Sequence, residues 1–145
     1  MTSETKLTVR YQETDQMGIV HHSVYPIWFE CGRTDLIKHA GLTYSHLENL
    51  GIGLPLIGME CKFLYPAHYE DEILVKSGVI NLTPARITFC YEIFKKGYTK
   101  AIVSGQTEHV WANDKLKPVN MKKYRPDIYK LMETYFVEDV NHEEK

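Results

Sequence analysis

The pattern of apolar and polar residues divides the chain into an early strand, two helices and a later run of strands. In the stretch 6–13, Leu7, Val9 and Tyr11 alternate with polar residues, which predicts a half-buried strand. In the stretch 22–41 the period changes to spacings of three and four, as on one face of a helix. The apolar positions of that face are Tyr25, Trp28, Phe29, Leu36, Ile37 and Ala40.

The ends of this long helix carry recognisable signals. Ser23 is the expected N-cap, and Pro26 falls in the first turn, where a missing N–H costs little. Gly41 is the expected C-terminal stop. Gly32 lies inside the helix, where glycine costs about 1 kcal/mol relative to alanine. We therefore expect Gly32 to mark close packing against a sheet.

The rest of the chain predicts a short helix, four strands and a closing helix. The expected ranges are 43–51 for the short helix, 54–66, 71–83, 85–97 and 100–114 for the strands, and 125–136 for the closing helix. Short turns between consecutive strands predict antiparallel neighbours. Helices segregated from a run of strands indicate an α+β fold, with the long helix across one face of a strongly curved sheet. The other sheet face still carries Val, Ile and Phe, so we expect self-association to cover part of it.

Length and composition are those of one ordinary globular domain. The chain has 145 residues, of which 43% are hydrophobic and 25% charged, and we assign residues 1–136 to a single domain and 137–145 to a charged tail. A net charge of −2 gives no electrostatic footprint for nucleic acid or for an anionic membrane surface. No apolar run approaches the ~20 residues of a membrane span, and the N-terminus lacks a signal peptide. The chain has three cysteines and no C-x-x-C pair. Together with the lack of a membrane span and of a signal peptide, this cysteine pattern predicts a cytoplasmic location.

The polar stretch "ETDQMGIVHHSVY" (13–25) holds the candidate chemistry. Its two histidines, His21 and His22, are neighbours, so their side chains diverge on any regular backbone. Zinc ligands usually come from separated positions, and no recognisable ligand spacing occurs in the sequence. We therefore predict no metal and no other cofactor.

A catalytic interpretation of the same stretch centres on Asp15. This carboxylate follows the predicted strand, Gly18 lets the backbone fold back, and the long helix then begins near His22. The first N–H groups of a helix lack internal partners and suit a developing oxyanion, while a carboxylate near them can act as nucleophile or general base. The alternative is ordinary turn chemistry, in which Asp15 only bonds loop amides. Spacing alone leaves both open.

A longer pattern adds a resemblance to a known family. The stretch "YQETDQMGIVHHSVYPIWFECGR" (11–33) resembles the signature of the hotdog-fold acyl-CoA thioesterases, in the branch of 4-hydroxybenzoyl-CoA thioesterase and the YbgC-like enzymes. Downstream, "MECKFLYPAHYEDEILV" (59–75) resembles a further segment of the same family. The residues that stand where the signature asks are Thr14, Asp15, Gly18, Val20, His22, Tyr25, Trp28, Phe29, Glu30 and Arg33.

The resemblance implies a fold, a reaction and an assembly. The fold is a curved antiparallel sheet wrapped around one long central helix, and the reaction is hydrolysis of acyl-CoA to a free acid and coenzyme A without a cofactor. The catalytic carboxylate falls on Asp15, as nucleophile or base, and the amide that polarises the thioester carbonyl falls on His22. The active site is expected at a subunit interface of a homodimer or homotetramer, where the partner subunit completes the acyl pocket.

Five further residues are assigned to substrate binding. Gly18 and Val20 shape the loop. His21 orients the loop, faces solvent or takes part in catalysis, and Tyr25 either packs beside the site or touches substrate. Glu30 either forms a helix pair with Arg33, three positions on, or bonds the catalytic loop.

Other functions remain open at this stage. The hotdog fold also houses dehydratases and acyl-carrier-protein thioesterases, and a fold alone does not choose among them. A non-catalytic protein that binds an acyl ligand or an acyl carrier protein is an alternative from another class. The sequence does not specify the acyl chain.

Overall fold

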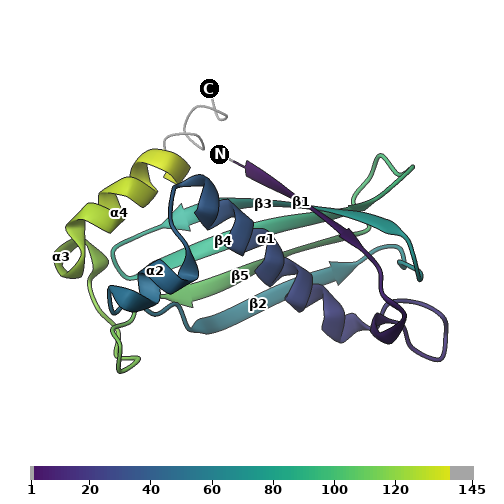
Figure 1. Ribbon diagram of the computed structural model, residues 1–145, viewed down its shortest axis with the longest axis horizontal. Coiled ribbons are helices and arrows are strands. Elements are labelled where there is room, and N and C mark those ends of the chain that lie inside the picture. Colours follow the sequence, from purple (N-terminus) through teal and green to yellow (C-terminus); the bar gives the residue numbers. More distant parts are fainter. Residues whose placement is uncertain (1, 138–145) are drawn as a thin grey trace.

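The computed structural model describes residues 2–137 and consists of one antiparallel sheet with a long helix across one face (Figure 1). Its strands lie in the order β1-β3-β4-β5-β2. They are β1 (Thr2–Thr8), β2 (Leu56–Phe63), β3 (Glu72–Leu82), β4 (Arg86–Lys95) and β5 (Val103–Val110). The predicted α+β class is confirmed. The predicted tail begins at residue 137, which ends the last helix, and 138–145 lie outside the described residues.

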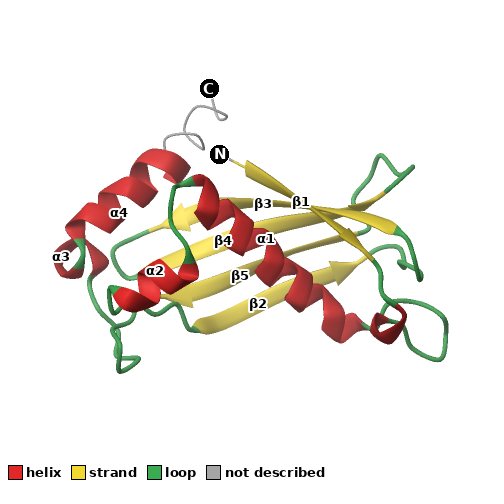
Figure 2. Ribbon diagram, viewed as in Figure 1, coloured by secondary structure: helices red, strands yellow, loops and turns green. Residues whose placement is uncertain are grey.

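Helices occupy one face and the two ends of the sheet (Figure 2). The long helix α1 crosses the sheet face, and α2, α3 and α4 gather beyond its C-terminal end. The helices are η1 (Tyr11–Glu13), η2 (His22–Val24), α1 (Tyr25–His39), α2 (Tyr44–Asn49), α3 (Met121–Tyr124), α4 (Pro126–Met132) and η3 (Glu133–Val137).

The signals at the ends of α1 are partly confirmed. Pro26 lies in the first turn, and Gly41 follows the last turn with a φ of +84°, a left-handed conformation that glycine adopts without strain. The predicted Ser23 cap is wrong. The chain enters α1 through η2, where the His21 ring accepts a hydrogen bond from the Ser23 N–H instead.

Gly32 brings α1 close to the sheet, as its position inside the helix predicted. A Cβ at Gly32 would overlap the Ser77 hydroxyl and come within 2.9 Å of Val75 Cγ1 on β3. One turn earlier, the Phe29 ring stacks on Tyr91 of β4 with ring centroids 4.3 Å apart. The small residue and the large one together set the helix flat against the sheet.

The first strand differs from its predicted range of 6–13. It begins at Thr2 and ends at Thr8. The buried positions nearest the N-terminus are Ser3 and Thr5, which are polar, so the apolar alternation did not reveal where the strand starts. Thr5 Oγ1 donates a hydrogen bond to Asp35 Oδ2 on α1 at 2.6 Å. Tyr11, predicted on the buried face, is 74% exposed, since the chain has already turned into η1.

The pairing of β2 also differs from expectation. Consecutive order predicted β2 beside β3, but β2 pairs with β5 and β3 pairs with β1, so the two strands lie far apart in the sheet (Figure 1). The segment between them is occupied elsewhere: the Ala67 carbonyl accepts a hydrogen bond from the Val20 N–H at 2.8 Å, and His68 forms a bridge with Ile19. A connection that pairs with another loop cannot close a tight hairpin.

Exposed apolar side chains collect on β2 and the residues after it. On β3 to β5 the outward positions are mostly polar, and they include Lys76, Glu92, Ser104, Gln106 and Glu108. The Val, Ile and Phe expected on part of the outer face are therefore fewer than the sequence suggested, and most of the large exposed apolar side chains in the strands lie on β2, at the edge of the sheet. The exposed large apolar residues of this edge are Leu56, Ile57, Met59, Phe63, Leu64 and Tyr65.

A buried polar chain crosses the core between β4 and β5. The His109 ring contacts the Leu54 carbonyl at 3.0 Å and Thr107 Oγ1 at 2.9 Å, and Thr107 contacts the Tyr91 hydroxyl at 2.7 Å. Burial lowers the pKa of His109 below its ordinary value, and the Arg33 charge acts in the same direction. The ring is therefore neutral in the folded protein at neutral pH.

This histidine predicts a pH dependence of stability. The pKa of His109 is about 6.5 in the unfolded chain and lower in the folded protein, so the unfolded state binds a proton at a pH where the folded state does not. Its contribution is complete above that pKa and is lost as pH falls from there through the folded pKa. We expect urea unfolding between about pH 8 and about pH 5 to show a steeper loss of unfolding free energy in the wild type than in His109→Gln. Equal losses in both proteins would contradict this assignment.

Candidate active site

The segment between η1 and η2 forms a small hairpin, residues 14–21, that we call the active-site loop. Thr14 and Val20 form a bridge, and the Asp15 N–H donates to the Ile19 carbonyl at 2.9 Å. The turn closes where the Gly18 N–H donates to the Asp15 carbonyl at 2.9 Å. Gly18 has a φ of +79°, which explains the glycine at this point. Its predicted role in shaping the loop follows from this turn.

The Asp15 carboxylate is half-buried and partly restrained. Its Oδ1 accepts a hydrogen bond from the Met17 N–H at 2.8 Å, the loop-amide contact that turn chemistry predicts. Among the described residues, no donor is assigned to Oδ2. The first bond fixes the orientation of the side chain and leaves the second oxygen available, so the two interpretations of Asp15 are compatible.

The start of the helix supplies an N–H group without an internal partner. His21 has the extended conformation, with φ −65° and ψ 141°, and its carbonyl accepts from the Val24 N–H at 3.0 Å. The hydrogen bonds of residues 2–137 assign no acceptor to the His22 N–H. Because η2 leads directly into α1, this N–H lies at the positive end of the helix dipole.

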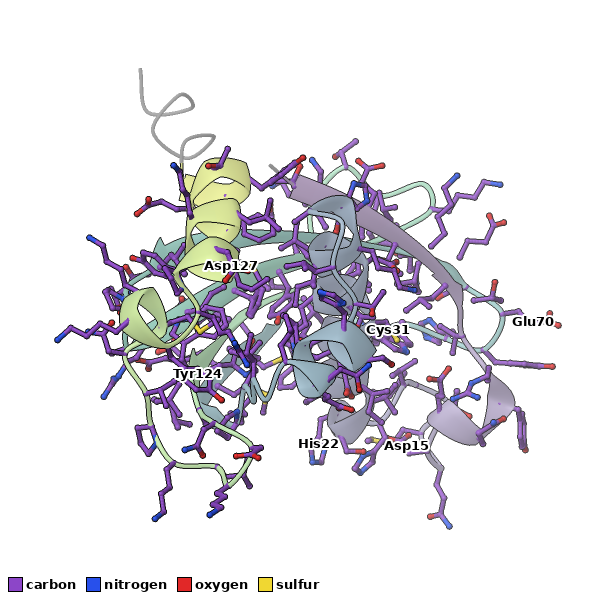
Figure 3. All side chains as sticks on the ribbon, turned by 60° about the vertical axis from the view of Figure 1, so that its left-hand side comes forward. Asp15, His22, Cys31, Glu70, Tyr124 and Asp127 are labelled. Atoms are coloured by element: carbon purple, nitrogen blue, oxygen red, sulfur yellow. The ribbon has the colours of Figure 1, made fainter. Side chains whose placement is uncertain are left out.

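Asp15 and His22 border the same cavity, which has a volume of about 300 Å³. Figure 3 shows both side chains at the N-terminal end of α1, far from Asp127 on α4. The opposite wall comes from the end of β2 and the residues after it, and it is mainly apolar. The lining residues are Asp15, Met17, Ile19, Val20, His22, Tyr25, Phe63, Leu64, Tyr65 and Pro66.

Tyr25 forms the inner wall of this cavity. It is buried, and its ring centroid lies 5.1 Å from that of Trp28 and 5.5 Å from that of Phe63. Burial raises the pKa of the Tyr25 hydroxyl above its ordinary value, so the phenol stays neutral at neutral pH. The residue thus packs beside the site, as one of the two sequence interpretations expected, and also borders the cavity.

Three of the residues assigned to substrate, Gly18, His21 and Glu30, lie outside the cavity lining. The His21 ring lies 4.1 Å from the His22 ring and bonds the Ser23 hydroxyl at 2.8 Å, which suits orientation of the loop. Glu30 is exposed and borders a second cavity together with Arg33. Among the described residues its carboxylate has neither an ion pair with Arg33 nor a hydrogen bond to the loop. A contact of any of these three residues with substrate stays a prediction.

Glu13 is a residue of the site that the sequence interpretation missed. It is only 6% exposed, and its carboxylate accepts hydrogen bonds from the Arg10 N–H and from the Trp28 indole N–H. No local pattern marked Glu13, because it lies in η1 beyond the end of the strand, and the alternation that reaches position 13 also places the exposed Tyr11 on the buried face.

Metal and membrane signals are both missing from the described residues. Within residues 2–137, no three His, Cys, Asp or Glu side chains gather closely enough to hold a metal ion. None of the helices in that range is both long and apolar enough to cross a membrane.

Known proteins resemble this chain over most of its length. A profile of the thioesterase-like superfamily matches residues 9–128. YneP of Bacillus subtilis, named a putative acyl-CoA thioesterase, is 31% identical over 131 residues, which cover 90% of this chain and 95% of its own. ATL3 of Arabidopsis thaliana, named an acyl-acyl carrier protein thioesterase, is 30% identical over 118 residues, 81% of this chain and 62% of its own.

A solved structure extends the likeness to three dimensions. The DHNA-CoA thioesterase of Staphylococcus aureus superposes on this chain with a TM-score of 0.90 at 30% identity. The superposition covers 99% of this chain and 95% of the other.

Proposed function

We propose, from the premise that the chain belongs to the thioesterase-like superfamily, that it hydrolyses an acyl-CoA thioester to a free carboxylic acid and coenzyme A. Membership and the superposition also confirm the predicted hotdog fold. The observation that carries the proposal is the shared cavity, which Asp15 and His22 both line beside an apolar wall. The hydrogen bonds of the described residues assign no acceptor to the His22 N–H. Acyl transfer from a thioester can use a carboxylate as nucleophile or base and an N–H donor for the oxyanion.

The two groups have complementary roles in the reaction. In one route Asp15 Oδ2 attacks the thioester carbonyl carbon, the carbonyl oxygen becomes an oxyanion, and the His22 N–H donates to it. Loss of the coenzyme A thiolate leaves a mixed anhydride on Asp15, which water then hydrolyses. In the other route Asp15 takes a proton from water, which attacks the same carbon and expels the same thiolate. Both routes need the carboxylate and the amide in the same places.

The apolar surroundings strengthen this arrangement. Tyr25 and Phe63 place apolar rings along the cavity, which reduces the screening of the interaction between the His22 N–H and the developing negative charge. The neutral Tyr25 phenol adds no charge that would compete with the oxyanion.

An acyl panel tests the proposed activity. Purified protein is assayed for thiol release with short, long and aromatic acyl-CoA substrates and with matched acyl-acyl carrier proteins. We expect hydrolysis of at least one acyl-CoA at a rate well above the background. Turnover of the carrier-protein substrates alone would favour the acyl-carrier-protein thioesterase, and binding of the carrier without any turnover would favour the non-catalytic alternative.

The exposed edge of β2 supports self-association. This strand pairs only with β5 among the described strands, and its other edge offers free N–H and carbonyl groups beside exposed Ile57, Met59 and Phe63. A second copy of the chain that pairs antiparallel with β2 covers this edge. In such a twofold dimer, the middle of β2 lies opposite the middle of the same strand in the other copy. We propose such a homodimer for the protein.

A charge near the middle of β2 tests the dimer. In Met59→Glu, two carboxylates face each other across the twofold axis and repel. We expect analytical ultracentrifugation to give twice the chain mass for the wild type and a single chain mass for this variant. Ile80→Glu, at a similarly exposed position on β3, serves as the control and should stay dimeric. A monomeric wild type would contradict the proposal.

A further inference from the structure

The Glu13 side chain connects the start of the active-site loop to α1. Its Oε1 accepts a hydrogen bond from the Arg10 N–H at 2.8 Å, and its Oε2 accepts one from Trp28 Nε1 at 3.0 Å. Glu13 is 6% exposed and Trp28 is 3% exposed, so water does not replace these donors. Oε1 also lies 3.6 Å from the Arg10 Nε in an ion pair, whereas the Trp28 indole is the donor given for Oε2 among the described residues.

The backbone of the same residue closes the active-site loop. The His21 N–H donates to the Glu13 carbonyl at 2.9 Å, so both ends of the loop meet at Glu13. Asp15 follows two residues later, and His22 is the next residue after His21. A displacement of Glu13 relative to α1 thus moves the carboxylate and the helix N-terminal amide relative to each other.

We infer that Glu13 is a positioning residue for the hydrolysis proposed above, on which this role rests. Through its bond to Trp28 it fixes the base of the active-site loop against the first turns of α1. That bond holds Asp15 at attack distance from a carbonyl whose oxygen is bound at the His22 N–H. Small misplacements of reacting groups have large kinetic effects, because about 1 Å can change a rate about 100-fold.

The chemistry of a carboxylate suits this position better than its substitutes. Both neighbours of Glu13 are N–H donors, and a carboxylate presents an acceptor to each. A glutamine has the same shape but presents an NH₂ group to one of them, so one of the two bonds is lost. An aspartate keeps both acceptors and loses one methylene of reach.

A pair of buried indoles gives a matched experiment. Trp28→Phe removes the donor to Glu13, and Trp111→Phe removes a comparable bond, the one from Trp111 Nε1 to the Thr83 carbonyl at 3.1 Å. Both tryptophans are buried, so both variants should lose thermal stability. We expect Trp28→Phe and Glu13→Gln to lower kcat about 10-fold or more with KM nearly unchanged, and Trp111→Phe to keep the wild-type kcat. Glu13→Asp should retain more kcat than Glu13→Gln.

The double variant separates positioning from general destabilisation. Glu13→Ala and Trp28→Phe remove the acceptor and the donor of the same bond, so their losses in kcat should not multiply when they are combined. If both single variants kept the wild-type kcat, or if their losses multiplied fully in the double variant, the positioning role of Glu13 would be overturned and the proposed function would stand. A wild-type protein that hydrolyses no thioester would overturn the proposed function together with this role.

Discussion

Replacing His22 by proline is expected to lower kcat for thioester hydrolysis about 10²- to 10³-fold while the protein still folds. Proline lacks the backbone N–H that we place on the oxyanion, and removal of one such donor has effects of this size. The backbone tolerates the change, because His21 already has the extended conformation required before proline, and proline is accepted at the first position of a helix. The measurement is kcat by thiol release, with circular dichroism to verify the fold.

His22→Ala is the matched control. It removes the imidazole ring and keeps the N–H, so we expect it to retain most of the wild-type kcat. If the alanine variant loses as much activity as the proline variant, the ring rather than the amide carries the function of His22. That result would contradict the oxyanion assignment and leave Asp15 unaffected.

The Asp15→Asn variant is expected to lose at least about 10³-fold in kcat with an unchanged fold. The amide oxygen of asparagine can still accept the hydrogen bond from the Met17 N–H, so the active-site loop keeps its shape. The amide has neither the negative charge of a nucleophile nor the basicity to accept a proton from water. Both routes of hydrolysis are therefore blocked.

Asp127→Asn is the charge-matched control for this change. Asp127 lies in the first turn of α4, far from Asp15 (Figure 3). This variant alters the net charge by the same amount and should keep the wild-type kcat. An equal loss of activity in both variants would show that the effect of Asp15→Asn comes from net charge and not from the site.

The sequence predicted the elements whose signals are local. The helix α1 has an apolar face of period three to four, a proline in its first turn and a glycine after its end, and it lies where these features placed it. The start of β1 was missed because its buried positions, Ser3 and Thr5, are polar and are satisfied by contacts with α1 that no pattern reveals. The pairing of β2 with β5 was missed because it joins strands about 40 residues apart, which strand order along the chain does not specify.

The same distinction applies to the site. Asp15, Gly18 and His22 lie in one continuous segment, so a loop carboxylate beside a helix N-terminus could be expected from sequence. The apolar wall could not, since Phe63 comes from a strand that approaches the loop only in the folded sheet. The contact between Glu13 and Trp28 likewise joins two elements, and the spacing of the two residues along the chain does not reveal that these elements lie close together.

The central claim is that Asp15 is the group with which this chain hydrolyses a thioester. The most direct test compares thiol release by the wild type and by Asp15→Asn on the acyl-CoA that the wild type turns over fastest. We predict enzymatic turnover by the wild type and at least about 10³-fold less by the variant, with equal melting temperatures. Near wild-type hydrolysis by Asp15→Asn would contradict the account.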